Sequence, residues 1–125
     1  MLEQDYEAMK AYSQSKLAQV MFTFELAEHL RGTGVTVNAL HPASLMNTKM
    51  VQSTFGYSMS TVEEGTQAVV RLAVSKELEG VTGRYFDGTR EARANRQAYD
   101  PRVRDRLWVL SEQLCGRLLE PVVRR

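Results

Sequence analysis

Residues 12–40 read YSQSKLAQVMFTFELAEHLRGTGVTVNAL, and the expected architecture follows from this stretch. Apolar side chains recur at intervals of three and four over 12–31, which predicts an amphipathic helix with one wide buried stripe. A glycine turn at 32–34 and a β-branched strand at 35–40 follow. Together they form the second half of a βαβ unit, so we expect an α/β fold whose parallel sheet carries helices on both faces. The stripe residues are Leu17, Val20, Met21, Phe24, Ala27 and Leu30.

Tyr12 and Lys16 stand four residues apart at the head of this helix and therefore share one of its faces. A tyrosine phenol is a poor acid or base at neutral pH because its ordinary pKa is about 10. A neighbouring ammonium group favours the phenolate, so the pair has the spacing that a general acid/base acting on an alcohol or carbonyl oxygen needs. The spacing alone also fits a half-buried tyrosine that caps the helix beside a solvated lysine.

The loop after the predicted strand lies outside the strand's carboxyl end, where open α/β sheets bind ligands. Pro42 fixes the direction of the chain there, and Ser44, Asn47 and Thr48 offer two hydroxyls and an amide. A plain turn capped by its own polar side chains is an equal alternative. We expect His41 to be a structural residue at the strand end, since no neighbouring cluster argues for a metal.

The other segments give weaker signals. Residues 1–10 are polar and indicate a loop, and 49–59 fit either a lid over a substrate or a surface connection. The segment 60–63 has a hydroxyl and a glutamate at the spacing of a capping box, with Ser60 as the cap, and predicts a helix over about 61–76. An aromatic strand is expected at 84–88.

The C-terminal part is rich in arginine. Residues 89–106 fit either a patch for phosphate or nucleic acid, or a solvated face and linker, and the nearly neutral whole chain favours the second. Asp100 and Pro101 are typical of a helix start, so we expect a helix over 101–120. Trp108 is expected to anchor this helix against the sheet or a partner.

Composition places the chain among soluble single-domain proteins. It has 125 residues, 43% of them hydrophobic and 25% charged, and a formal net charge of +1. Neither a membrane-spanning run nor a signal peptide is recognisable, so we expect a cytoplasmic protein with no nucleic-acid or membrane partner. The single cysteine, Cys115, excludes an internal disulfide or a cysteine metal cluster, and we expect it to be buried and inert.

The ordered combination of motifs goes beyond a lone Tyr-x-x-x-Lys. YSQSK at 12–16, GVTVN at 34–38 and HP at 41–42, with Thr48 downstream, closely resemble the C-terminal half of the short-chain dehydrogenase/reductase family. Two departures stand out, because Ala43 replaces the family's usual glycine and the threonine falls one place late. The resemblance implies the C-terminal portion of a Rossmann-like, doubly wound parallel sheet.

The resemblance also implies a domain organisation. Residues 1–125 would form a partial NAD(P)-binding Rossmann-like domain, with 10–90 family-like and 91–125 a variable C-terminal extension. The family's glycine-rich turn, which holds the pyrophosphate at a helix N-terminus, has no counterpart in these residues. We therefore expect the isolated chain to be unstable, to form a homo-oligomer, or to need a missing N-terminal half that covers its apolar stripe.

By the resemblance, the chain is an NAD(P)-dependent oxidoreductase that transfers hydride between nicotinamide and a small-molecule alcohol or carbonyl substrate. Tyr12 would be the catalytic acid/base, and Lys16 would stabilise its phenolate and bind the nicotinamide ribose. The positions that the resemblance assigns to the NAD or NADP site are Tyr12, Lys16, Pro42, Ser44, Leu45 and Thr48. The alternative is a catalytically silent, truncated interaction module that pairs through its two amphipathic helices, at 12–31 and 101–120.

Overall fold

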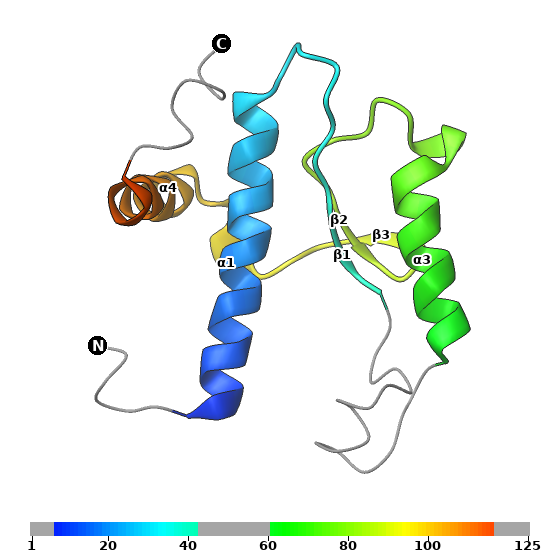
Figure 1. Ribbon diagram of the computed structural model, residues 1–125, viewed down its shortest axis with the longest axis horizontal. Coiled ribbons are helices and arrows are strands. Elements are labelled where there is room, and N and C mark those ends of the chain that lie inside the picture. The colour runs from blue at the N-terminus through cyan, green and yellow to red at the C-terminus, as the bar shows by residue number, and fades with distance from the viewer. Residues whose placement is uncertain (1–6, 43–60, 117–125) are drawn as a thin grey trace.

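The computed structural model describes residues 7–42 and 61–116 (Figure 1). The expectations for Ser44, Leu45, Thr48 and the segment 49–59 lie outside the described residues. The described elements are α1 (Ala8–His29), β1 (Ala39–His41), α3 (Val62–Val74), the 3-10 helix η1 (Lys76–Leu78), β2 (Tyr85–Asp87), β3 (Arg90–Ala92), the 3-10 helix η2 (Arg96–Tyr99) and α4 (Pro101–Cys115).

The first helix is confirmed, but its bounds differ from the prediction. It begins at Ala8, so the loop expected over 1–10 is wrong for its last three residues, and Tyr12 lies in the second turn. No side chain caps its start, which is why the sequence carried no signal for it. The helix ends at His29, two residues before the predicted end at 31, and the chain then turns at Gly32, whose φ of +84° favours glycine.

The predicted apolar stripe is the face on which α1 packs. Met21, Phe24 and Ala27 are each 6% exposed, and Leu17 and Val20 pack half-buried against the same cluster. Residues three or four apart lie on the same face of an α-helix, so these side chains form one row along it. The buried centre of the stripe therefore carries the core of the described part of the chain, together with Ala98 from η2.

The sheet is smaller and more mixed than predicted. Its strand order is β1-β2-β3, with β1 and β2 parallel as expected and β2 and β3 antiparallel. The β3 strand was missed, because an arginine-rich sequence gives no strand signal. The first strand covers Ala39–His41 instead of 35–40. Before it, Val37 bonds to Thr82 and Gly83, and the side chain of Asn38 bonds to Val81 and Arg84, so a regular ladder does not form there.

The helices lie on both sides of the sheet. Figure 1 shows α1 on one side of β1 and α3 on the other, as the sequence predicted. The cap of α3 is Thr61, whose hydroxyl accepts a hydrogen bond from the backbone N–H of Glu64 at 3.1 Å. The predicted cap was one residue too early, because Ser60-x-x-Glu63 and Thr61-x-x-Glu64 satisfy the same pattern.

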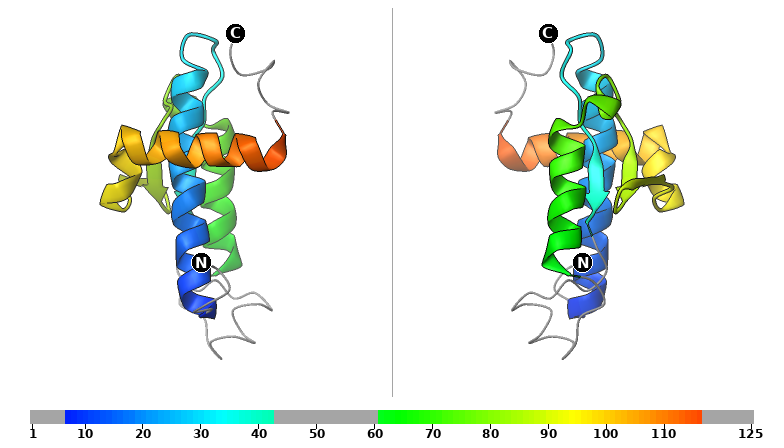
Figure 2. Two further views of the ribbon diagram at one scale, coloured as in Figure 1. Left: turned by 90° about the vertical axis from the view of Figure 1, so that its left-hand side faces the viewer. Right: turned by 90° about the vertical axis from the view of Figure 1, so that its right-hand side faces the viewer.

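The last helix runs across the outside of α1 (Figure 2). Its predicted start is confirmed, with Asp100 accepting a bond from the N–H of Arg102 at 3.0 Å and Pro101 at the first helical position. It ends at Cys115 and not near residue 120, and Gly116 follows with a φ of +71°. Cys115 is exposed, so the expectation of a buried thiol is wrong.

Trp108 is the anchor of α4, as predicted, but it packs on α1 and not on the sheet. Its ring stacks on Phe22 at 5.3 Å and on His29 at 4.4 Å between centroids, and only 6% of it is exposed. Aromatic stacking and burial both stabilise such a contact. Within the described ranges, no helix is both long and apolar enough to span a membrane.

Candidate functional site

The start of α1 and the carboxyl end of β1 lie at the same end of the molecule. The helix and the strand run in opposite directions and contact each other (Figures 1 and 2). The second turn of α1, which carries Tyr12, is therefore at the end of the sheet where β1 leads into Pro42. The fold brings together, at one end, the two segments from which the sequence predicted a site.

Tyr12 and Lys16 share one face of α1, as their spacing predicted. The Lys16 Nζ atom lies 5.5 Å from the centroid of the Tyr12 ring, within the range of a cation–π contact. The helix begins four residues before Tyr12, so the alternative in which Tyr12 caps the helix is wrong, and its side chain is 50% exposed. The phenol and the ammonium group are therefore next to each other and open to a ligand.

Neither side chain of the pair is committed to the packing of the protein. The Lys16 ammonium donates one long hydrogen bond, of 3.4 Å, to the amide oxygen of Gln19 on the next turn. The hydroxyl of Ser15 is already used, since it donates to the carbonyl oxygen of Tyr12 at 2.7 Å. The ammonium group keeps donors for a hydroxyl-bearing ligand, whereas Ser15 supports the helix backbone.

The carboxyl end of β1 is held by β2. The carbonyl oxygen of His41 accepts a hydrogen bond from the N–H of Gly88 at 2.8 Å, and His41 stands opposite Asp87 in the parallel register. Pro42 follows, half-buried. Its predicted place beside a ligand fits this position at the sheet's carboxyl edge, although its role stays a prediction.

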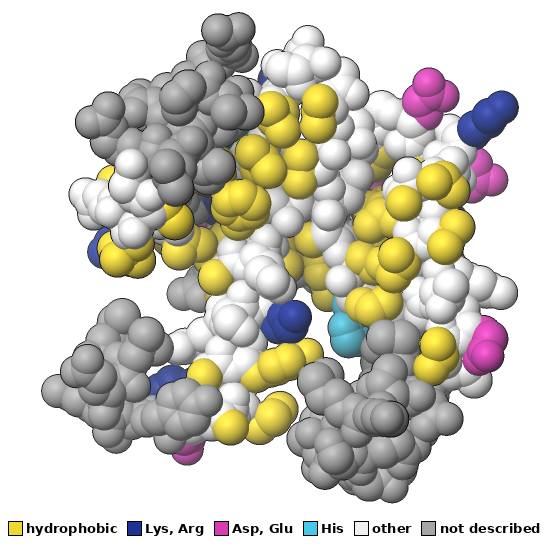
Figure 3. Space-filling view, in the orientation of Figure 1, with side chains coloured by type: hydrophobic (Ala, Val, Ile, Leu, Met, Phe, Trp, Pro, Cys, Tyr) yellow, Lys and Arg dark blue, Asp and Glu magenta, His cyan; other side chains and the backbone are white. Residues whose placement is uncertain are grey.

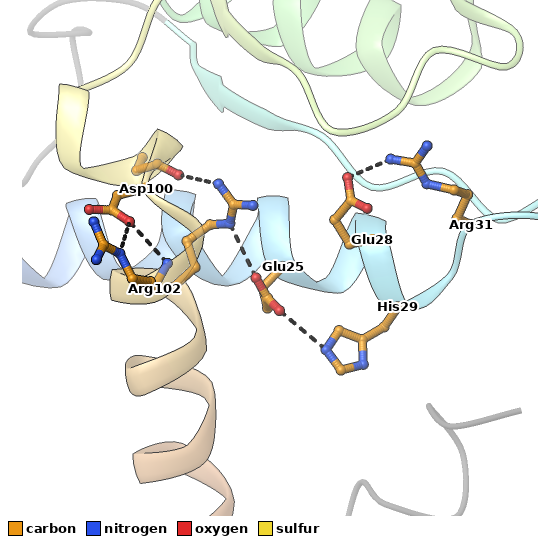
Figure 4. A network of polar contacts seen from close by, with 8 residues as sticks. Glu25, Glu28, His29, Arg31, Asp100 and Arg102 are labelled. Carbon is orange, nitrogen blue, oxygen red and sulfur yellow. Dashed lines mark hydrogen bonds and ion pairs between the residues drawn. The ribbon is translucent and has the colours of Figure 1, made fainter.

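A second polar cluster lies toward the other end of α1 and was missed by the sequence analysis (Figure 4). Arg104 of α4 donates from Nε to Glu25 at 3.2 Å and from Nη1 to the carbonyl oxygen of Ala98 at 3.0 Å. The other carboxylate oxygen of Glu25 lies 3.5 Å from Nε2 of His29. Glu25 and Arg104 are 79 residues apart in sequence, so no local pattern announces this contact.

This cluster is built for packing and not for a ligand. The side chains of Glu25 and Arg104 are only 15% and 13% exposed, and they join α1, η2 and α4. In the same view, Glu28 pairs with Arg31 at 2.6 Å on the solvent side of the helix end. Among the residues that the structure describes, no group of three or more His, Cys, Asp or Glu side chains could hold a metal ion.

The ionisation of Tyr85 is perturbed by its surroundings. Burial raises the pKa of Tyr85 above its ordinary value of 10.0, and the negative charge of Asp87 and the nearby Tyr99 raise it further. Tyr85 lies on β2 and packs against the core cluster. A phenol that holds its proton more tightly in this way serves the fold and is unsuited to act as a base.

Hydrophobic side chains gather over α1 and over α3 on the face shown in Figure 3. Three valines of α3, Val69, Val70 and Val74, are more than half exposed, and so is Met9 at the start of α1. These side chains are not those of the predicted stripe. The expectation that the stripe around Met21 and Phe24 lacks a partner within the chain is wrong, because η2 and α4 cover it.

Comparison with known proteins supports the family resemblance that the sequence motifs indicate. A family model described as short chain dehydrogenase matches residues 2–57. Retinol dehydrogenase 13 of Mus musculus is 42% identical over 125 residues, which cover 89% of this chain and 37% of that protein. Retinol dehydrogenase 14 of Homo sapiens is 40% identical, with 93% and 38% covered. WW domain-containing oxidoreductase of Pongo abelii is 34% identical, with 88% and 29% covered.

These relatives are much longer than this chain. It spans less than two fifths of the length of each of the three. No solved structure matches it. The similarity nevertheless extends along most of the chain, across both the Tyr12–Lys16 helix and the C-terminal helix.

Proposed function

The chain belongs to the short-chain dehydrogenase/reductase family, and we propose that it supplies the acid/base part of an NAD(P)-dependent oxidoreductase. The reaction is hydride transfer between the nicotinamide of NAD or NADP and an alcohol or carbonyl substrate. The observation that carries the proposal is the exposed Tyr12–Lys16 pair, in which Nζ lies 5.5 Å from the ring centroid. The pair is near the start of α1, at the end of the molecule where β1 also ends.

The residues present fit a nicotinamide nucleotide. Among the described residues, the Lys16 ammonium donates one long bond, to Gln19, and a ribose offers hydroxyl acceptors for its other donors. Pro42 stands at the strand end, where α/β sheets bind nucleotides. The cofactor, when bound, accepts or donates the hydride, and Ser44, Leu45 and Thr48 are proposed to complete its site.

The protein's part of the chemistry is proton transfer. In the reduction of a carbonyl, the phenol of Tyr12 gives its proton to the substrate oxygen; in the oxidation of an alcohol, the phenolate takes that proton. The Lys16 ammonium, next to the ring, stabilises the phenolate charge.

The relatives suggest the first substrate to test. Two of those described above are named retinol dehydrogenases, and retinol is an alcohol with a long apolar tail. We propose an apolar alcohol of this kind, or the matching aldehyde, as the substrate of the protein to which these residues belong. The alternative of a catalytically silent interaction module is not favoured by the family membership.

The proposal is tested by titrating the protein with NADH and NADPH while cofactor fluorescence is recorded, followed by turnover of retinol. We expect saturable binding, and loss of at least about a hundredfold of turnover in Tyr12→Phe, since general acid/base groups contribute that much. Lys16→Ala should weaken cofactor binding, whereas Lys10→Ala, an exposed lysine on the same helix, should not. Full turnover by Tyr12→Phe would refute the assignment.

A further inference from the structure

The bend before β2 contains an inserted side chain. Val81 and Arg84 flank a bend at Gly83, whose φ is +70°. The carboxamide of Asn38, from the segment before β1, lies between them: Nδ2 donates to the carbonyl oxygen of Val81 at 2.9 Å, and Oδ1 accepts from the N–H of Arg84 at 3.0 Å. One planar group thus satisfies both an acceptor and a donor of the bend.

Four further bonds join the same two segments, and the longest runs from the Thr82 hydroxyl to the carbonyl oxygen of Val37 at 3.4 Å. The N–H of Val37 donates to the hydroxyl of Thr82 at 2.9 Å, and the N–H of Gly83 donates to the carbonyl oxygen of Val37 at 2.8 Å. The N–H of Ala39 then donates to the carbonyl oxygen of Arg84 at 3.0 Å, which starts the regular ladder. We call Val37, Asn38 and the bend 81–84 the strand clasp.

The strand clasp also rests on α1. A side-chain carbon built on Gly83 would lie 3.5 Å from the Cβ atom of Ala27, which is 6% exposed. The bend is therefore in contact with the buried stripe of the helix that carries Tyr12. A change in the bend would alter the relation of both strands to that helix, because packed interiors transmit small shifts.

We propose that Asn38 is a positioning residue for the cofactor site, an inference that rests on the proposed function. Strand β1 is only three residues long, so its own ladder does little to fix its register. The carboxamide of Asn38 sets that register from the bend, and the register decides where His41 and Pro42 stand at the carboxyl edge. Asn38 fixes the register through its two hydrogen bonds, and not through the bulk of its side chain.

This assignment distinguishes Asn38 from a residue that only adds stability. An aspartate has the same shape, and its neutral acid form can donate to Val81 and accept from Arg84 as the amide does. The ionised form can only accept, and it faces the carbonyl oxygen of Val81. Low pH should therefore reverse the defects of Asn38→Asp. If the side chain acted through its bulk alone, Asn38→Asp would behave like the parent protein at every pH.

The experiment measures amide exchange at the carboxyl end of β1 as well as the affinity for the cofactor. Asn38→Asp and Asn38→Ala are compared with the parent between about pH 5 and pH 8, the range over which a buried carboxyl with a raised pKa titrates. The first readout is hydrogen exchange of the Gly88 amide, which donates to the carbonyl oxygen of His41. The second is NADPH affinity, and thermal unfolding of each variant is recorded as the control for folding.

We expect Asn38→Ala to speed Gly88 exchange and to weaken NADPH binding about tenfold at every pH, because it removes one part-buried and one exposed hydrogen bond of the bend. Asn38→Asp should show both defects at pH 8 and lose them as the pH falls. Unchanged Gly88 exchange in folded Asn38→Ala would overturn the inference, whatever the cofactor does. If the parent itself binds neither NADH nor NADPH, the proposed function fails, and Gly88 exchange still decides the role of Asn38.

A matched variant keeps the test valid if Asn38→Ala does not fold. Thr82→Val removes the hydroxyl that accepts from Val37 but leaves the Asn38 carboxamide and its two bonds in place. We expect Thr82→Val to lower stability without the acid rescue. An acid rescue in Thr82→Val as large as that in Asn38→Asp would assign the pH effect to the bend in general and refute the specific role of Asn38.

Discussion

The two halves of α1 differ in what their side chains do. In the C-terminal half, Glu25 and His29 contact α4, and Phe24 and Ala27 are buried. In the N-terminal half, Tyr12 is 50% exposed and its ring contacts Lys16. One helix thus combines a packed end that fixes its position with an open end that is free for a ligand, as functional sites on rigid elements require.

The packed end should respond most strongly to loss of Trp108. Trp108→Ala removes a ring that is 6% exposed and stacks on Phe22 and His29. We expect the free energy of unfolding to fall by about 3–5 kcal/mol, the usual cost of truncating a buried tryptophan. Urea unfolding followed by circular dichroism measures it. Leu114→Ala on the same helix, where the side chain is 79% exposed, should change stability by less than about 0.5 kcal/mol.

The next largest effect is expected at the Glu25–Arg104 pair. Arg104→Ala leaves the carboxylate of Glu25 with its His29 contact alone and the carbonyl oxygen of Ala98 without this donor. Because both side chains are mostly buried, we expect a loss of about 1–3 kcal/mol.

Arg31→Ala is the matched control for this pair. It breaks the ion pair with Glu28 on the same helix, whose side chains are 76% and 51% exposed. Exposed pairs contribute about 0–1 kcal/mol, so the control should be close to the parent in urea unfolding. Equal losses in the two variants would contradict the distinction between buried and solvent-side pairs.

A smaller effect is expected from Tyr85 at alkaline pH. Its pKa in the folded chain is raised above the ordinary value, chiefly by burial, so folding is favoured while the phenol is protonated. This stability is fully present below about pH 10 and is lost as the pH rises through the folded-state pKa. Tyr85→Phe should therefore lose less stability than the parent between pH 9 and pH 11, roughly the range of tyrosine titration. Parallel stability curves for the two proteins would contradict this.

The sequence predicted the parts of this structure that depend on local patterns. The stripe around Met21 and Phe24, the face shared by Tyr12 and Lys16, and the cap at Asp100 all follow from spacing within one or two helical turns. Family resemblance then gave the fold class. These signals are local because a helix brings residues three and four apart together.

The missed features depend on distant pairings. Arg104 reaches Glu25 across 79 residues, and Asn38 bonds to Arg84 across 46, so no window of the sequence contains both partners. Strand β3 was missed for a related reason, since Arg90–Ala92 forms a strand by pairing with β2 and not through its own propensity. Contacts of this kind join segments far apart in sequence, so a motif can contain one partner, such as Asn38, without indicating the other.

The smallest expected effect on stability is at the N-terminal end of α1, where the side chains are exposed. Lys16→Ala removes an exposed side chain whose bond to Gln19 is long, so we expect the free energy of unfolding to change by less than about 0.5 kcal/mol, as in Lys10→Ala. The two variants should separate only in cofactor binding, which Lys16→Ala alone weakens. If Lys16→Ala destabilised the chain as Arg104→Ala does, the N-terminal half of α1 would be part of the packing, and its exposed pair would lose its claim to be a site.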